Sequence, residues 1–166
     1  MKILHFPNEI LRERMPAFDF ENPVTDPVQL EQEMLQCMYS QDGIGLAANQ
    51  VGVRTRMFVM GHGSLPENGM AFFNPVIEGV VDEFEDYEEG CLSFPGIYVP
   101  IKRPKKIKAK WQNSKGEWQE GEFSGYECRC FLHEFDHLEG IVFKDRISTL
   151  KWALGVKKSK PKHKRK

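Results

Sequence analysis

The residues best suited to do chemistry form the run His133-Glu134-Phe135-Asp136-His137, an HExxH pattern. On a helix, residues four apart lie on one face, so His133 and His137 can bind one metal ion together. Glu134 then lies beside the same site, where it can accept a proton from water and pass it to a leaving group. The alternative is a solvated helix face with an incidental pair of histidines. The pattern predicts a metal-dependent hydrolase.

HExxH is typical of zinc proteases, but this chain lacks the third ligand of the two common protease forms. The extended form HExxHxxGxxH requires a histidine at position 143, which is Phe143 here. The other form uses a downstream glutamate, and no glutamate follows Glu139. Asp145 and His163 remain conceivable, but we expect the third ligand to come from upstream.

Cys91, in the segment Glu88–Ser93, is the best upstream candidate. The preceding Gly90 lets the backbone approach a ligand closely. One thiolate and two imidazoles leave a fourth metal position open for water, as a catalytic site requires. A nucleophilic pair of Cys91 with a histidine is the alternative. The metal site is favoured because it uses both histidines and Glu134 together.

The segment Gly43–Gln50 is too small and too rich in glycine for an ordinary core. It would let a substrate backbone lie close, and Gln50 could donate an amide N–H to a developing oxyanion. A phosphate-binding loop is the competing interpretation. No Lys-Ser/Thr pair follows, and the strand–loop–helix context is missing, so the phosphate-binding interpretation is discounted.

These residues must be positioned by helices and strands in a particular order. Periodicity, caps and glycines predict helices at 9–14, at 27–40 after the Asp26-Pro27 start, at Tyr126–Leu138, and after Ser148 or Thr149 up to Gly155. Strands are expected at 56–60, 71–77 and 80–84, with a hairpin of 105–112 and 117–123. This order predicts an α+β fold, with mostly antiparallel sheets packed around a central metal-ligand helix.

Size and composition indicate one globular domain. The chain has 166 residues, of which 40% are apolar and 28% charged. No apolar run approaches the ~20 residues of a membrane span, and the N-terminus resembles neither a signal peptide nor an import leader. Without a secretion signal, the four cysteines are not expected to form disulfides, and Cys37 is interpreted as a small buried apolar residue. We expect a cytoplasmic protein without a membrane partner.

The charge is unevenly distributed along the chain. Residues 151–166 carry eight of the 23 Lys and Arg residues and no acid, whereas residues 1–150 carry the other 15 bases and all 24 acids. We divide the chain into a catalytic domain at 1–150 and a basic tail at 151–166, with Val156–Lys166 lacking stable structure of its own. The tail is either a solubilising end or a segment that RNA phosphates attract.

The three chemical segments together resemble the peptide deformylase family. Its pattern of GxGxAAxQ, EGCLS and HExDH is present without a mismatch at Gly43–Gln50, Glu89–Ser93 and His133–His137. The resemblance spans about residues 1–150, including the flanks Ile3–Arg14 and His137–Gly140. One position departs from the pattern, because Leu132 stands where the family commonly has glutamine.

The resemblance implies a role for each site residue. Glu134 would be the general acid and base, and Gln50 with the backbone N–H of Leu92 would stabilise the tetrahedral intermediate. Arg103 would pair with Asp136 or Glu89. The metal ligands would be Cys91, His133 and His137. The substrate-binding residues, including those of a methionine pocket, would be Ile44, Gly45, Tyr87, Gly90, Tyr126, Arg129 and Cys130.

The resemblance also implies an activity, a cofactor and partners. The enzyme would remove the formyl group from the N-terminal formyl-methionine of nascent polypeptides and release formate. It would use one divalent metal per chain, Fe(II) first, with Zn(II) or Ni(II) also compatible with these ligands. Formyl-methionyl peptides would be the substrates, and the basic tail could contact the ribosome or its RNA. A metalloprotease and a catalytically inactive metal-stabilised binding protein are the alternatives; intact Glu134 and Gln50 argue against the latter.

Overall fold

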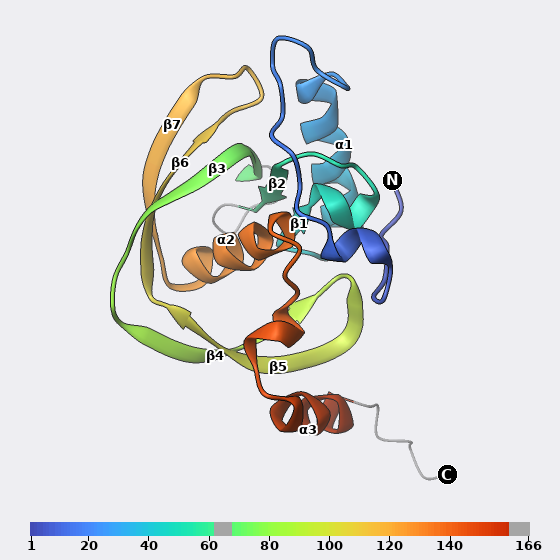
Figure 1. Ribbon diagram of the computed structural model, residues 1–166, viewed down its shortest axis with the longest axis vertical. Coiled ribbons are helices and arrows are strands. Elements are labelled where there is room, and N and C mark those ends of the chain that lie inside the picture. Colours follow the sequence, from blue (N-terminus) through green and yellow to red (C-terminus); the bar gives the residue numbers. More distant parts are fainter. Residues whose placement is uncertain (62–67, 160–166) are drawn as a thin grey trace.

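The computed structural model describes residues 1–61 and 68–159, and in this part of the chain strands wrap around one helix (Figure 1). That helix is α2 (Gly125–Leu138), which carries the HExxH run. The strands are β1 (Gly45–Ala47), β2 (Met57–Met60), β3 (Met70–Val80), β4 (Phe84–Cys91), β5 (Phe94–Pro104), β6 (Lys106–Gln112) and β7 (Trp118–Ser124).

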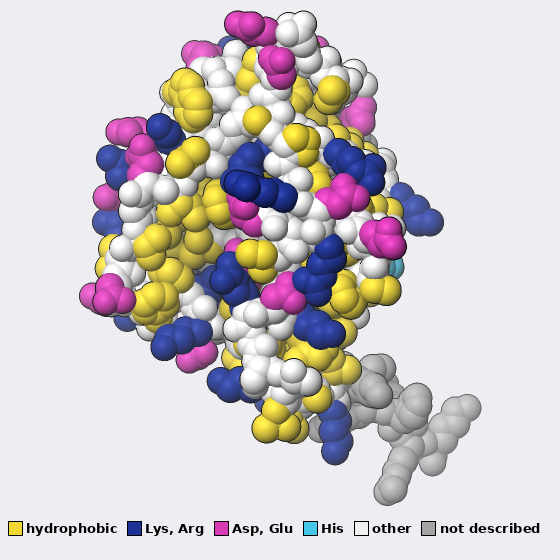
Figure 2. Space-filling model, in the orientation of Figure 1, with side chains coloured by type: hydrophobic (Ala, Val, Ile, Leu, Met, Phe, Trp, Pro, Cys, Tyr) yellow, Lys and Arg dark blue, Asp and Glu magenta, His cyan; other side chains and the backbone are white. Residues whose placement is uncertain are grey.

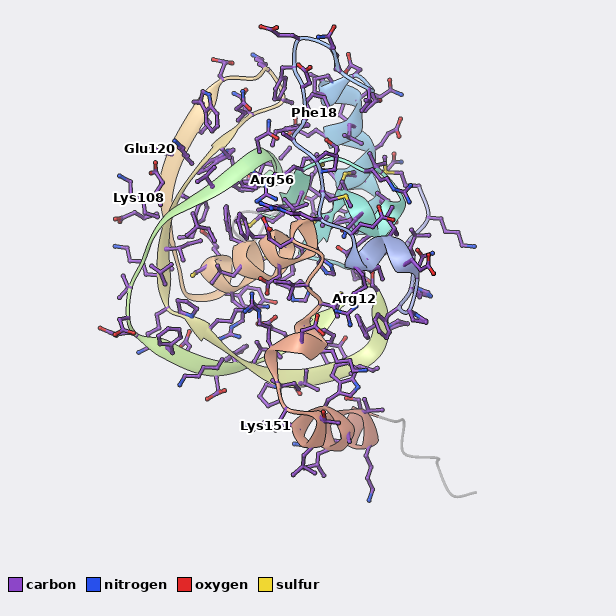
Figure 3. The ribbon with its side chains drawn as sticks, viewed as in Figure 1. Arg12, Phe18, Arg56, Lys108, Glu120 and Lys151 are labelled. Atoms are coloured by element: carbon purple, nitrogen blue, oxygen red, sulfur yellow. The ribbon has the colours of Figure 1, made fainter. Side chains whose placement is uncertain are left out.

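The strands form two sheets in which every pair is antiparallel. One sheet has the order β1-β2-β3-β6-β7, and the other consists of β4 and β5. The predicted hairpin is present as β6 and β7, and its alternation holds, because Ile107 and Ala109 are buried while Lys108 and Glu120 point outward (Figure 3). The predicted α+β class is confirmed.

An aromatic core holds α2 against the larger sheet. The ring of Phe131 lies 5.0 Å from that of Phe58, 5.4 Å from that of Phe72 and 5.0 Å from that of Phe123, measured between centroids. Residues two apart on a helix point to nearly opposite sides. Burial of Phe131 in this core therefore turns His133 away from it, toward the smaller sheet.

The predicted first long helix is present as α1 (Pro27–Ser40), capped by Asp26, whose side chain accepts from the Gln29 N–H. It buries one apolar face against β1, β2 and β3. The predicted helix at 9–14 is a shorter 3₁₀ turn, Glu9–Arg12, capped by Asn8. Within the described residues, no helix is long and apolar enough to span a membrane.

The strand prediction at 80–84 is wrong, because β3 runs on to Val80 and β4 begins at Phe84. Strands β1 and β4 were not predicted, and neither was β5, which contains Pro95, Pro100 and Pro104. Proline cannot donate to a ladder, but β5 pairs only with β4, so its other edge tolerates proline.

The last helix is longer than predicted. Helix α3 (Thr149–Ser159) continues through Gly155, which is buried against Val99 of β5 so closely that a Cβ there would collide with it. Ser159 ends the helix and holds it to β5 through its hydroxyl, which accepts from the Tyr98 N–H at 3.1 Å. The expectation of no stable structure is therefore wrong for 156–159. Residues 160–166, which it also covered, lie outside the described residues.

Candidate active site

Three side chains suited to bind a metal meet where the end of β4 faces α2. The sulfur of Cys91 and one nitrogen each of His133 and His137 all lie within 4.8 Å of one another. The closest pair is Cys91 Sγ and His137 Nε2, at 3.4 Å. In residues 1–61 and 68–159, no further His, Cys, Asp or Glu belongs to this group. The donor set fits one divalent metal with a coordination position left for water or substrate.

The two downstream candidates do not join this group among the described residues. The Asp145 carboxylate instead accepts hydrogen bonds from Arg12 and from the Val142 N–H. His163 lies outside the described residues. The upstream cysteine is thus the third donor that the fold brings to the histidine pair.

A buried charge network orients His133. Its Nδ1 lies 2.8 Å from Glu89 Oε1, which leaves Nε2 for the metal. Arg103 donates to both oxygens of Glu89, at 2.9 and 3.0 Å, and also to Asp136 at 2.7 Å. Burial alone would raise the pKa of Glu89, but hydrogen bonds from His133 and Arg103 lower it to about 2. Glu89 is therefore an anion that holds the imidazole in one orientation.

Arg103 bonds both of its expected partners, but several supports of α2 were not predicted. Glu89 itself had no assigned role, although it lies in β4 only two residues before Cys91. Asn49 donates from Nδ2 to the His137 carbonyl at 2.8 Å. Arg146 donates to Asp136. These partners are far apart in the sequence, so spacing alone could not indicate them.

Burial sets the protonation of His137 and of Glu134. It holds the pKa of His137 well below its usual value, and the positive charge of a protonated His133 lowers that pKa further. His137 is thus neutral, which is the form that binds metals. Burial likewise raises the pKa of Glu134 to about 7. A carboxyl group with that pKa can both accept and return a proton near neutral pH.

The glycines of the Gly43–Gln50 segment make room for the active-site side chains. A Cβ on Gly45 would lie 2.5 Å from Glu134 Oε1 and 2.9 Å from Cys130 Sγ. A Cβ on Gly43 would lie 2.7 Å from the side chain of Leu92. We expected these glycines to admit a substrate backbone, and their immediate neighbours prove to be the side chains of the protein itself.

Among the described residues, the edge of β1 beside Glu134 has no partner strand. Strand β1 is the first strand of the five-stranded order, and the strand it pairs with in this part of the chain is β2. The Ile44 carbonyl accepts from the Gly61 N–H on the β2 side. Because neighbouring residues of a strand direct their amides to opposite sides, Gly45 directs its own N–H and C=O away from β2. An extended peptide could therefore add to this edge.

Gln50 and Leu92 both lie next to Cys91. Gln50 is buried, and its Nε2 lies 3.6 Å from Cys91 Sγ. Leu92 is half-buried in the two-residue turn between β4 and β5. Both line the same cleft as Cys91, His133 and Glu134. Both residues predicted to contact the oxyanion thus lie near the metal donors.

The predicted substrate-binding residues line this cleft of about 980 Å³ together. Ile44, Tyr87 and Tyr126 are exposed at its rim. Arg129 is buried, and its guanidinium is occupied by Glu89 and by backbone carbonyls of the small sheet. Leu132, the departure from the family pattern, packs in the apolar core and is not among the cleft residues. The set is Ile44, Gly45, Tyr87, Gly90, Tyr126, Arg129 and Cys130.

Known proteins are similar to this chain in sequence. The profile of the family described as polypeptide deformylase matches residues 1–152. The peptide deformylase of Thermotoga maritima is 46% identical over 158 residues, covering 95% of this chain and 93% of that protein. The peptide deformylase of Zymomonas mobilis is 39% identical, covering 95% and 92%.

Solved structures agree with the sequence relatives. The crystal structure of peptide deformylase from Thermotoga maritima superposes with a TM-score of 0.82 at 44% identity, covering 89% of this chain and 97% of that one. A peptide deformylase from Synechococcus elongatus, solved in complex with actinonin, gives a TM-score of 0.86 at 32% identity, covering 96% and 85%.

Proposed function

Because the chain belongs to the peptide deformylase family, a family of metal-dependent hydrolases, we propose that it removes the formyl group from the N-terminal formyl-methionine of nascent polypeptides. The observation that carries the proposal is the Cys91, His133 and His137 group with the buried carboxyl of Glu134 in the same cleft. The products are formate and a peptide with a free N-terminal amine.

The substrate binds as an extended strand along the free edge of β1. The backbone groups of Gly45 on that edge pair with the peptide, as in other cases of strand addition to a sheet. The methionine side chain enters the part of the cleft near Cys130, and Ile44, Tyr87 and Tyr126 cover it. This placement is supported by the lining of the cleft and by the sheet order.

A divalent ion held by Cys91, His133 and His137 would polarise the formyl oxygen and lower the pKa of its bound water to about 7. Glu134 accepts a proton from the water that attacks the formyl carbon. As negative charge develops on the carbonyl oxygen, Gln50 Nε2 and the Leu92 N–H donate hydrogen bonds to it. Glu134 then gives the proton to the amine nitrogen as the C–N bond breaks.

Fe(II) is the proposed native ion, and Zn(II) or Ni(II) are able to bind the same donors. One thiolate with two imidazoles is compatible with all three ions. Protein prepared without oxygen and loaded separately with each ion distinguishes them by the rate of formate release per bound metal. An enzyme that works faster with zinc than with iron would contradict the assignment.

The protein acts in the cytoplasm, and its C-terminal end contacts the ribosome or its RNA. The catalytic domain ends near residue 150, and the basic tail follows from 151. Helix α3 exposes Leu150 and Leu154, and apolar and basic side chains gather over it at the lower end of the molecule (Figure 2). Clustered cations would release counterions from RNA, so co-sedimentation with ribosomes should fall steeply with salt. Unchanged co-sedimentation after deletion of 156–166 would refute this contact.

Formate release from a formyl-Met peptide tests the activity. The metal-loaded wild type should release formate, and Glu134→Gln should lose at least ~100-fold in rate, because the proton carrier is removed. Glu139→Gln, one turn further along the same chain, is the matched control and should stay active. Digestion of internal bonds in unformylated peptides would favour a protease. Bound metal without either activity would favour a binding protein.

A further inference from the structure

Three hydrogen bonds determine how the amide of Gln50 is oriented. Its Oε1 accepts from the Ala47 N–H at 2.8 Å. Its Nε2 lies 3.1 Å from Ser93 Oγ and 3.6 Å from Cys91 Sγ. A backbone N–H can only donate, so the amide oxygen must face Ala47 and the amide nitrogen must face the other two partners.

The geometry leaves one N–H of Gln50 for the active site. A primary amide has two N–H groups in one plane. The first donates to Ser93 Oγ, which is the shorter contact. The second then points toward Cys91 Sγ, where the metal donors meet. With Ala47 and Ser93 holding two corners of the planar group, the third corner is directed at the reacting atoms.

Ser93 lies where it can hold the Gln50 amide but where it does not contact the substrate directly. Its side chain is 1% exposed, and it is not among the residues that line the cleft. The N-terminal segment fixes both backbones, because the Leu4 N–H donates to the Gln50 carbonyl at 2.7 Å and the Phe6 N–H to the Ser93 carbonyl at 2.9 Å. The two side chains therefore come from different segments, the 3₁₀ helix Ala48–Val51 and the β4–β5 turn, and the N-terminal segment holds the two together.

We infer that Ser93 is a positioning residue that acts through Gln50, by fixing the amide so that its second N–H is delivered to the oxyanion. The inference rests on the proposed deformylase function for its effect on rate. Without the hydroxyl, the amide keeps the Ala47 contact and the longer contact with Cys91 Sγ, so it can tilt, and one buried N–H is left without its partner. The loss should appear in kcat, because the contact matters only when charge develops on the substrate oxygen.

A double-mutant cycle on the metal-loaded enzyme tests this. Gln50→Ala should lower kcat about 100-fold, as removal of an oxyanion donor does elsewhere. Ser93→Ala should lower kcat about 10-fold and leave KM within about twofold, and in the Gln50→Ala background it should have no further effect. Ser93→Thr, which restores the hydroxyl, should recover part of the loss, and the exposed Ser124→Ala is the control that should change nothing. An equal loss in both backgrounds, or no loss in either, would overturn the inference.

A second measurement does not depend on activity. In zinc-loaded protein, the side-chain amide signals of Gln50 are identified by their absence from the spectrum of Gln50→Ala. They should shift and exchange faster with solvent in Ser93→Ala, but not in Ser124→Ala. Unchanged signals would overturn the pairing. A wild type that releases no formate but shows this response would refute the proposed function and leave the pairing of Ser93 with Gln50 intact.

Discussion

Glu89 Oε1 lies 2.8 Å from Nδ1 of His133, and the same carboxylate is held on its other side by Arg103. A residue that binds no metal thus decides which nitrogen of the ligand histidine faces the metal. It also raises the basicity of that nitrogen, because the hydrogen bond to an anion stabilises the N–H form at Nδ1. Strand β4, which ends at Cys91, and helix α2, which carries the two histidines, are joined through this contact.

Replacement of Glu89 by glutamine should weaken metal binding more than it changes the fold. A neutral amide is a poorer partner for His133, and loss of such partners typically costs 10–100-fold in metal affinity. Competition with a chelator measures the dissociation constant. Glu88→Gln, at the exposed neighbouring position, is the control and should keep the affinity of the wild type. Equal affinities for all three proteins would show that Glu89 does not support the ligand.

Glu89 should also make the metal-free protein sensitive to acid. Its pKa is about 2 in the folded protein against an ordinary value of 4.5, so the unfolded state takes up the proton first. The contribution of Glu89 to stability is therefore complete above about pH 4.5 and is lost as the pH falls toward 2. Urea unfolding across this window should show a smaller decline for Glu89→Gln than for wild type. A parallel decline in the two proteins would contradict the assignment.

Gly45→Ala should damage the active site, since the new Cβ would lie 2.5 Å from Glu134 Oε1. Either the carboxyl group or β1 must move, and a misplacement of about 1 Å can cost about 100-fold in rate. The matched control is Gly79→Ala in β3, where the nearest atom would be 3.9 Å away, at ordinary contact distance. Formate release by the control should be unchanged. Full activity of Gly45→Ala would mean that the site tolerates a shift of Glu134.

Removal of the metal should expose one reactive thiol. Cys91 is partly exposed, whereas Cys37, Cys128 and Cys130 are buried. Burial raises the pKa of Cys128 to about 11 and that of Cys130 well above its usual value, so both stay protonated at pH 8. Iodoacetamide should therefore label Cys91 first in chelator-treated protein, as peptide mass spectrometry can determine. Labelling of Cys91 at the same rate in metal-loaded protein would argue against its role as a ligand.

Local sequence patterns were enough to predict those features that are determined by residues close to one another in the sequence. The spacing of His133 and His137 specifies two donors on one helix face because the helical period does so in any fold. The N-terminal cap of α1 and the alternation of the β6–β7 hairpin are local in the same sense, and both were predicted. The choice of Cys91 as third donor also came from the sequence, by exclusion of downstream candidates and by resemblance.

Tertiary structure decided what depends on contact between distant segments. Strand β5 can contain its prolines because, in the described part of the chain, it pairs with β4 alone. Helix α3 continues beyond Gly155 because it packs there against Val99. The same holds for the contacts of Glu89 with His133 and of Ser93 with Gln50, which join residues 44 and 43 positions apart. The sequence by itself thus identified the metal donors and the side chain that we propose as the proton carrier. Only the folded chain determined what holds them in place. A buried polar group needs a hydrogen-bond partner, and the folded structure decides which distant residue lies close enough to be that partner, so a local sequence pattern cannot predict it.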